Sequence, residues 1–188
     1  MIKTKEELNY YLECDRVAMA RKSNRPKLFG DEVWKFERVM RRLDYAVENH
    51  KIYSCILRLR YHQLGLKLGF QIPYNICGPG LALWHSGPII IAMNAKIGKN
   101  CCILPCVNIG SNGGSSDAAE IGDNVYIAPG VKIIGKVRIG DNAAIGANAV
   151  VIHDVEKGVT VGGIPAKQIS NNDSSSNIIK ATEIVDAR

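Results

Sequence analysis

The most regular hydrophobic pattern in the chain runs from Ile91 to Val151 and repeats every six residues. Aliphatic residues fill ten of eleven in-phase positions: Ile91, Ile97, Ile103, Ile109, Ile121, Ile127, Ile133, Ile139, Ile145 and Val151. A helix repeats at about 3.6 residues and a strand at about 2, so neither element alone explains a sustained period of six. The spacing predicts a solenoid in which each hexapeptide forms a short strand and a corner, and three hexapeptides form one coil.

Small residues mark the predicted corners. Glycine or alanine often follows the aliphatic position, as at Gly98, Gly110, Gly122, Ala128, Gly140 and Gly146. Such residues let the backbone turn tightly. The repeat breaks between Gly110 and Glu120, where the sequence SNGGSSDAA is polar and glycine-rich, and the same phase resumes at Ile121. This break predicts a loop projecting from one corner, and loops on rigid scaffolds often carry functional sites.

The first 70 residues have a helical pattern. Thr4 followed by Glu7 forms a capping-box sequence, which predicts the start of a first helix. Residues 21–30 predict a loop, Asp31 is placed to cap a second helix, and a third is expected at about residues 51–68. These amphipathic helices should pack on the first coil of the solenoid or on neighbouring subunits. A membrane-surface role for the basic third helix is the weaker alternative, because such charge is often only a solvated face.

The chain therefore divides into an α-helical N-terminal region (1–70), a solenoid domain (71–169) and a C-terminal tail (170–188). The tail is polar at first and weakly apolar at its end, so it is expected to be mobile, with a loosely attached end as the alternative. Its 188 residues are 46% hydrophobic but only 6% aromatic, which suits a narrow interior filled by Ile and Val. The net charge of +6 is explained either by a solvated basic surface or by attraction of a polyanionic cosubstrate. With no recognised nucleic-acid motif or aromatic platform, nucleic-acid binding is not expected.

No secretory signal is expected at residues 1–20. Residues 1–20 carry charges without an apolar run, and no apolar segment is long enough to span a bilayer. We therefore expect a cytoplasmic protein for which membrane contact is the less favoured reading, and whose six cysteines are reduced thiols. Cys101, Cys102 and Cys106 lack the spacing of a zinc site, so no metal is expected.

From Gly80 to Lys167 the sequence resembles the hexapeptide-repeat acyltransferases, and among them the serine acetyltransferase branch. The resemblance rests on the hexapeptides, on the segment GLALWHSG at 80–87, and on the closing sequence VGGIPAK at 161–167. It implies a mainly β fold, a left-handed parallel β-helix preceded by α-helices, that usually works as a homotrimer. The left hand comes from the resemblance alone, because connections between parallel strands are otherwise nearly always right-handed.

His85 is the candidate catalytic residue. Acetyl transfer to a hydroxyl needs a base of near-neutral pKa, and histidine is the natural one. By the resemblance, a histidine in this position, followed two residues later by glycine, is the general base. The alternative is a buried structural histidine, because the hexapeptide phase extrapolated back from Ile91 would point His85 inward. Gly87 and Pro88 interrupt that phase, so we favour catalysis.

Three positions depart from the serine acetyltransferase pattern. Trp84 stands where that branch has an aspartate directly before the histidine, Phe70 where it has another aspartate, and Ala118 where it has a second histidine. The group that orients the imidazole therefore stays open between Asp117, Glu120 and a backbone carbonyl. Because the losses affect residues expected to hold an amino-acid acceptor, they favour a changed acceptor.

The resemblance implies that acetyl-CoA binds as a cosubstrate, not as a tightly bound cofactor, in a groove between neighbouring prisms. The residues implied to contact it are mostly small: Gly110, Ala128, Pro129, Gly130, Gly146, Ala147 and Lys167. Lys132 and Lys136 join Lys167 as candidates for the phosphates. Each of these residues is also explained as an ordinary corner residue or a solvated charge.

The first functional hypothesis is an acetyl-CoA-dependent O-acetyltransferase. A hydroxyl of a sugar or polysaccharide precursor would attack the acetyl group directly, with His85 as general base. Serine O-acetyltransferase of cysteine biosynthesis is one alternative. A non-catalytic trimeric scaffold is another, and the missing aspartates and histidine give it some support.

Overall fold

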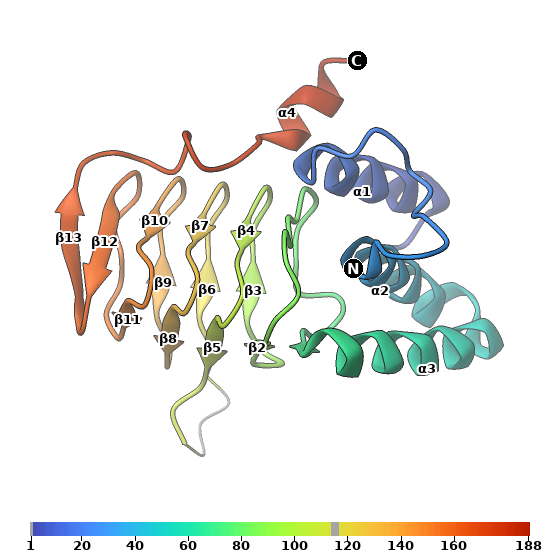
Figure 1. The fold of residues 1–188 in the computed structure, drawn as a ribbon, viewed down its shortest axis with the longest axis horizontal. Coiled ribbons are helices and arrows are strands. Elements are labelled where there is room, and N and C mark those ends of the chain that lie inside the picture. Colours follow the sequence, from blue (N-terminus) through green and yellow to red (C-terminus); the bar gives the residue numbers. More distant parts are fainter. Residues whose placement is uncertain (1, 114–116) are drawn as a thin grey trace.

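The computed structural model describes residues 2–113 and 117–188. Three helices come first: α1 (Lys5–Ala18), α2 (Glu32–Asn49) and α3 (Lys51–Leu68). A parallel β-helix follows, and a short helix, α4 (Ala181–Asp186), ends the chain beside α1 (Figure 1). No helix in the described residues is long and apolar enough to cross a bilayer.

The β-helix is a triangular prism with one sheet on each side. The first sheet contains β1 (Phe70–Gln71), β2 (Ile89–Ile91), β5 (Asn108–Gly110), β8 (Lys132–Ile134) and β11 (Val150–Val151). The second contains β3 (Lys96–Ile97), β6 (Glu120–Ile121) and β9 (Arg138–Ile139). The third contains β4 (Cys102–Ile103), β7 (Tyr126–Ile127), β10 (Ala144–Ile145), β12 (Thr160–Gly163) and β13 (Ala166–Ser170), of which β13 alone runs antiparallel to its neighbour.

The six-residue repeat is confirmed as the repeat of the prism. Ile91 pairs with Ile109, and Ile109 with Ile133, so equivalent residues stack in register from coil to coil. All ten in-phase aliphatic residues belong to one buried core, each at most 4% exposed. Each layer therefore closes on the next through apolar contact and parallel backbone hydrogen bonds.

Three edges separate the sheets. The histidine edge joins the third sheet to the first, the loop edge joins the first to the second, and the asparagine edge joins the second to the third. The described connections on the histidine edge are 84–88, 104–107, 128–131 and 146–149. Those on the loop edge are 92–95, 111–113, 117–119 and 135–137. Those on the asparagine edge are 98–101, 122–125 and 140–143. The break in the repeat falls on the loop edge, as expected, although residues 114–116 lie outside the described residues.

The asparagine edge turns through left-handed backbone. Asn100, Asn124 and Asn142 have φ of 53°, 58° and 59°, a region that asparagine tolerates better than most residues. Their amides also stack, because Asn100 Nδ2 donates to Asn124 Oδ1 at 2.9 Å and Asn124 Nδ2 donates to Asn142 Oδ1 at 3.1 Å. The ladder fixes the spacing of three successive coils.

The first coil is built from residues that the repeat does not reveal. Phe70 pairs with Ile89, and isolated bridges join Cys77 to Ile97 and Ala82 to Cys102. The prism thus begins one coil before the aliphatic repeat becomes regular at Ile91.

The predicted helices are confirmed, with one correction at α2. The Thr4–Glu7 capping box is formed at the start of α1. Asp31 does precede α2, but its side chain makes no cap hydrogen bond. Its carboxylate instead accepts from the Lys27 backbone N–H at 3.0 Å and pairs with Arg21, because the backbone of Asp31 is left-handed.

The tail expected to be mobile is instead packed along the prism. From β13 it follows the asparagine edge back to the helices (Figure 1). The Ser174 backbone N–H donates to Asn142 O at 3.0 Å, and the Thr182 N–H donates to Asn100 Oδ1 at 3.0 Å. Ser174 and Thr182 are both buried, so their polar groups are held by the edge they cover.

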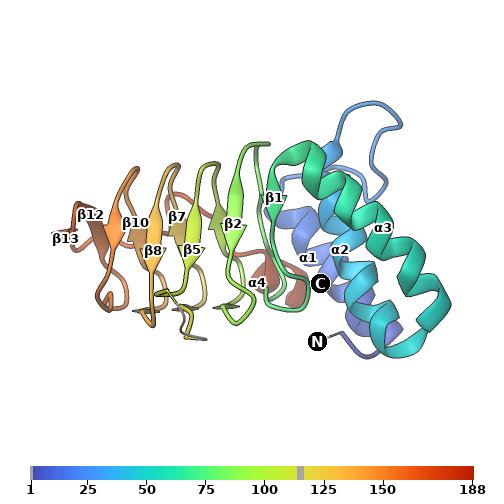
Figure 2. The ribbon, with the colours of Figure 1, turned by 90° about the horizontal axis from the view of Figure 1, so that it is seen from below.

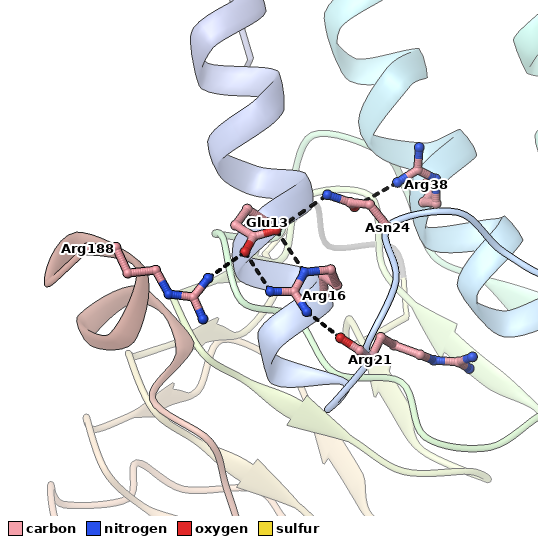
Figure 3. Close-up of polar contacts among 6 residues, drawn as sticks. All are labelled: Glu13, Arg16, Arg21, Asn24, Arg38 and Arg188. Atoms are coloured by element: carbon pink, nitrogen blue, oxygen red, sulfur yellow. Dashed lines mark hydrogen bonds and ion pairs between the residues drawn. The ribbon is translucent and has the colours of Figure 1, made fainter.

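The tail and the loop at residues 21–30 are tied to α1 through one carboxylate. Glu13 accepts from Arg16, from Asn24 at 3.3 Å and from Arg188 at 2.8 Å (Figure 3). Asn24 in turn accepts from Arg38 of α2 at 2.9 Å. The C-terminal residue, the loop and α2 therefore meet at one surface of α1.

Candidate active site

His85 lies on the histidine edge, exposed, between the first and second coils of the prism. The phase extrapolated from Ile91 would have pointed it inward, but Leu83 and Ile89 are the buried residues on either side. Gly87, with φ of 140°, changes the backbone direction between them, so the inward phase does not continue to His85. A Cβ at Gly87 would lie 2.9 Å from Cβ of Pro105, so this turn also needs glycine for space.

A buried polar network holds the segment that leads to His85. The Asp15 carboxylate of α1 accepts from the backbone N–H groups of Gly80 and Leu81, both at 2.9 Å. Glu37 of α2 accepts from the Leu83 N–H at 3.0 Å. These bonds satisfy backbone donors that lack a preceding coil to pair with. The helical region therefore positions the chain just before the histidine.

Arg41 completes this network from α2. Its guanidinium forms a bidentate pair with Asp15, at 2.7 and 3.1 Å, and donates to the carbonyls of Cys77 at 2.6 Å and Gly78 at 2.7 Å. Arg41, Asp15 and Glu37 are fully buried. Sequence reasoning missed all three, because charged residues on amphipathic helices are usually solvated.

Burial also shifts the pKa of Glu37. Desolvation, reinforced by the negative charge of Asp15, raises the pKa of Glu37 well above its usual value of 4.5. The hydrogen bond from the Leu83 backbone and the charge of Arg41 oppose this shift.

Trp84 and Ser86 flank His85 and line a hollow of about 400 Å³ against the helical region. Arg21 and Lys67 contribute cations to this hollow, and Asp31 and Glu32 contribute anions. Burial raises the pKa of the nearby Cys102 thiol to about 12, and the Trp84 indole opposes part of this shift. Trp84 itself is 40% exposed.

The histidine edge also carries most of the residues implied to bind the donor. Ala128, Pro129 and Gly130 form its turn between β7 and β8, and Gly146 and Ala147 begin the next turn. The Gly130 N–H donates to Pro105 O at 3.0 Å, and the Asn148 N–H donates to Pro129 O at 2.9 Å, so these turns stack directly. Successive coils are about 5 Å apart, so the column extends about 15 Å from His85.

Lys132 adds a positive charge to this column. Its ammonium donates to the carbonyls of Cys106 at 2.6 Å and Gly130 at 3.0 Å, both on the histidine edge. Lys167 lies farther along, on β13, where it pairs with Gly162 in the last coil. Lys136 lies on the loop edge, with its ammonium 3.9 Å from the Asp117 carboxylate.

Three other predicted residues are separated from His85 within one chain. Gly110 ends β5 at the loop edge, and Asp117 precedes β6 on the same edge. Glu120 lies on the second sheet, where it pairs with Lys96 at 2.9 Å and Arg138 at 3.8 Å. Among the described residues, no hydrogen bond or ion pair of His85 is formed.

The three neighbouring cysteines of the prism differ in their exposure to solvent. Cys101 and Cys102 are buried, whereas Cys106 is exposed on the histidine edge. Within residues 2–113 and 117–188, no group of three or more His, Cys, Asp or Glu side chains is arranged to hold a metal ion.

Comparison with known proteins relates this geometry to one group of enzymes. The bacterial transferase hexapeptide family, described by six repeats, matches residues 118–153. A serine acetyltransferase of Synechococcus elongatus is 35% identical over 117 residues, covering 61% of this chain and 48% of that protein. The chain thus spans about half the length of this curated relative.

The solved structures extend the likeness to the helical region. The serine acetyltransferase of Neisseria gonorrhoeae has a TM-score of 0.74 at 26% identity, covering 89% of this chain and 68% of that one. The same enzyme in complex with serine gives 0.71 at 27%, covering 88% and 70%. A serine acetyltransferase in complex with CoA gives 0.71 at 22%, covering 88% and 71%, which indicates a shared fold.

These comparisons confirm the resemblance to the serine acetyltransferase-like branch and the fold class, a left-handed parallel β-helix after an α-helical region. They contradict the expected sugar or polysaccharide acceptor, because the curated relative and the solved structures are serine acetyltransferases. The expectation of a changed acceptor, drawn from Phe70, Trp84 and Ala118, is therefore wrong.

Proposed function

We propose that this hexapeptide-repeat protein of the serine acetyltransferase-like branch transfers the acetyl group of acetyl-CoA to the hydroxyl of serine. The observation that carries the proposal is the extent of the likeness to serine acetyltransferases of known structure, which includes the helices as well as the prism and covers 89% of this chain. Because the helices position the segment before His85, a likeness that includes them bears on the site as well as the scaffold.

His85 acts as the general base in this proposal. Its imidazole takes the proton of the serine hydroxyl as the oxygen attacks the thioester carbonyl. The tetrahedral intermediate then collapses, the carbon–sulfur bond breaks, and the imidazolium returns the proton to the CoA thiolate. The products are O-acetylserine and CoA, without a covalent enzyme intermediate. The exposure of His85 on the histidine edge supports this role, because a base must reach a diffusible substrate.

Acetyl-CoA lies along the histidine edge, with its thioester near His85 and its pantetheine arm on the stacked turns. Ala128, Pro129, Gly130, Gly146 and Ala147 offer backbone that an extended chain can approach closely. Lys132 lies on the same column and is a stronger candidate for a phosphate than Lys136, which is on another edge. Lys167, in the last coil, suits the distal phosphates.

A homotrimer explains why the remaining candidates lie on a different edge. Two edges of one triangular prism cannot face the same groove, but the histidine edge of one subunit can face the loop edge of the next. In that arrangement Gly110 contacts the donor from the neighbouring subunit. Asp117 then becomes a candidate to orient the imidazole of His85 across the interface.

The test is release of free CoA thiol from acetyl-CoA in the presence of serine. His85→Ala should lower the rate about 10²–10⁴-fold, because it removes only the proton acceptor. His153→Ala is the matched control, since His153 is also exposed at a turn of the prism and should leave the rate unchanged. Acetyl-CoA should raise the melting temperature of all three proteins alike, because the donor binds the native state.

The outcomes separate the competing functions. Thiol release that His85→Ala does not slow would remove His85 as the base. Thermal stabilisation by acetyl-CoA without release, with serine or any sugar hydroxyl, would favour the non-catalytic scaffold, for which Trp84 and Ala118 in place of an aspartate and a histidine give specific support.

A further inference from the structure

Helix α3 carries an apolar stripe on its outward face. Ile52, Ile56, Leu59 and Leu66 are 86%, 62%, 61% and 72% exposed. Their spacing of four, three and seven residues places them on one side of the helix. The opposite side, with Leu57 and Leu68, is buried against the rest of the chain, so α3 is apolar on both faces. Figure 2 shows α3 on the outside of the helical region.

Positive charge borders this stripe on both sides. At about 100° per residue, Lys51 and Arg58 lie on one flank, and Arg60 and Lys67 lie on the other. The helix contains no Asp or Glu. Among the described residues only Lys67 has a carboxylate partner from elsewhere, Glu32 of α2 at 3.1 Å. The outward face of α3 is therefore apolar in the middle and cationic at its margins.

A cationic hollow adjoins the flank that carries Arg60. It has a volume of about 210 Å³, and Arg25, Lys35, Arg38, Arg42 and Arg60 line it. No carboxylate lines it within the described part of the chain. Arg38 is partly desolvated there, and its pKa is lowered by burial and by the charge of Arg42. Cations that repel one another in a small hollow favour an anionic occupant.

The charge pattern argues against a second copy of the chain as the cover of this face. A twofold contact between two α3 helices would bring the same flanks together, and like charges would then face like charges. An anionic surface complements both the flanks and the hollow. An apolar face with basic margins is also the pattern of helices that lie in the plane of a membrane interface.

We propose that α3 docks flat on an anionic lipid membrane. Its apolar stripe inserts among the acyl chains near the headgroups, its basic flanks contact the lipid phosphates, and the cationic hollow holds one headgroup. The sequence alone left membrane contact as the weaker alternative, because the basic charge of such a helix is often only a solvated face. The exposure of four large aliphatic side chains along one face of the helix now favours membrane contact over a solvated face.

The first test is sedimentation of the full-length protein with vesicles. Binding should be strong to vesicles of phosphatidylglycerol and phosphatidylcholine in equal parts, and weak to pure phosphatidylcholine. Ile56→Ser with Leu59→Ser should reduce partitioning at least about tenfold, because each change removes an apolar side chain from the insertion. Met93→Ser with Ile152→Ser is the matched control, since both residues are exposed apolar side chains on the prism.

The cationic contribution is tested separately. Arg42→Gln with Arg60→Gln should reduce binding about 25-fold, at about fivefold for each basic residue near the surface. Lys99→Gln with Lys157→Gln removes the same charge from exposed positions on the prism and should have little effect. Sodium chloride should weaken binding of the wild-type protein and have less effect on the arginine variant.

The two exposed cysteines allow the docked face to be identified. Cys55 lies on α3 beside the stripe, and Cys106 lies on the prism. A polarity-sensitive fluorophore on Cys55, with Cys106→Ser, should shift to shorter wavelength on anionic vesicles. The same fluorophore on Cys106, with Cys55→Ser, should not.

Equal binding to neutral and anionic vesicles would overturn the proposal. So would a loss of binding that is as large for the prism controls as for the α3 variants. If no vesicle binds, and the stripe variant instead changes the sedimentation coefficient of the free protein, the face is a contact between protein chains and the proposal is wrong.

Discussion

The coils of the prism and the helical region are attached to their neighbours by different kinds of contact. In the prism, each coil attaches to the next through aliphatic side chains such as Ile109, Ile133 and Ile145, which are completely buried. In the helical region, α2 also packs Phe36 and Met40 into the same apolar core, and α1 and α2 add buried charged and polar groups centred on Asp15 and Arg41. Apolar side chains are stable when their shapes fit together, whereas the buried Asp15–Arg41 pair is stable only when all of its hydrogen-bond donors and acceptors have partners.

The difference has a cause at the first coil. Later coils receive backbone donors and acceptors from the coil before them, but Gly80, Leu81 and Leu83 have no such partner for their N–H groups. Carboxylates from the helices provide the missing acceptors. The helical region therefore ends the prism and sets the position of the segment that carries His85.

The largest expected effect comes from breaking this polar attachment. Arg41→Ala should lower the free energy of unfolding by about 3–5 kcal/mol, because it leaves the Asp15 carboxylate buried without its partner. Urea denaturation followed by circular dichroism measures the change. Arg138→Ala is the matched control, because Arg138 lies exposed on the prism with a partner 3.8 Å away. A similar loss in both variants would contradict the distinction.

Within the prism, removing part of one apolar layer should cost slightly less. Ile133→Ala should destabilise the protein by about 2–5 kcal/mol and Ile133→Val by about 0.5–1.5 kcal/mol, because the cavity grows with the atoms removed. Differential scanning calorimetry on both variants gives the comparison. Equal costs for the two substitutions would mean that the layer relaxes around the cavity and that stacking is not the source of stability.

A pH titration separates the buried acids of the helices from the apolar prism. Burial raises the pKa of Asp44 from 3.8 to about 6, although Arg41 opposes the shift. The folded state therefore holds this proton more tightly than the unfolded state. The stability that Asp44 contributes is complete below pH 3.8 and is lost as the pH rises through about 6.

Asp44→Asn should abolish that loss, which is at most about 3 kcal/mol for this rise in pKa. The measurement is the difference between wild-type and variant unfolding free energies at pH 4 and at pH 7.5. Glu156→Gln, at an exposed carboxylate of the prism, controls for a general effect of removing one acid. If the wild type and Asp44→Asn change in parallel with pH, Asp44 is not buried as an acid.

The smallest effect is expected at the solvated ion pairs of the prism surface. Lys96→Ala breaks an exposed pair with Glu120 and should cost about 0.2–1 kcal/mol. The loss should shrink further in 0.5 M salt, because exposed charges are screened. A cost approaching that of Arg41→Ala would show that charge acts on the two regions in the same way.

Individual residues show where sequence reasoning succeeded and where it failed. All ten aliphatic positions of the repeat lie in the core, and the Thr4–Glu7 pattern correctly predicts the start of α1, because both signals are local. The position of Asp31 predicts a helix cap, but its left-handed backbone prevents one. The composition after Ser170 predicts a mobile tail, but Ser174 and Thr182 form hydrogen bonds with an edge that is far away in sequence.

The candidate site shows the same division. The exposure of His85 could not be read from the repeat, because the hexapeptide phase pointed inward and only the backbone of Gly87 redirects it. Ala128, Pro129, Gly130, Gly146 and Ala147 share the histidine edge because every coil is closed in the same register. The catalytic role of His85 and the donor-binding role of these residues stay predictions.

The six-residue repeat is sufficient to predict the prism, because each aliphatic residue has the same neighbours one coil away. Which charged residues are buried, where the tail packs and which side of α3 is exposed are known only from the folded chain. Those outcomes depend on contacts between segments far apart in the chain, such as Asp15 with Leu81 and Asn100 with Thr182. Residue type and local spacing do not encode such contacts, because the same side chain is stable in water or in a buried network once its partners are present.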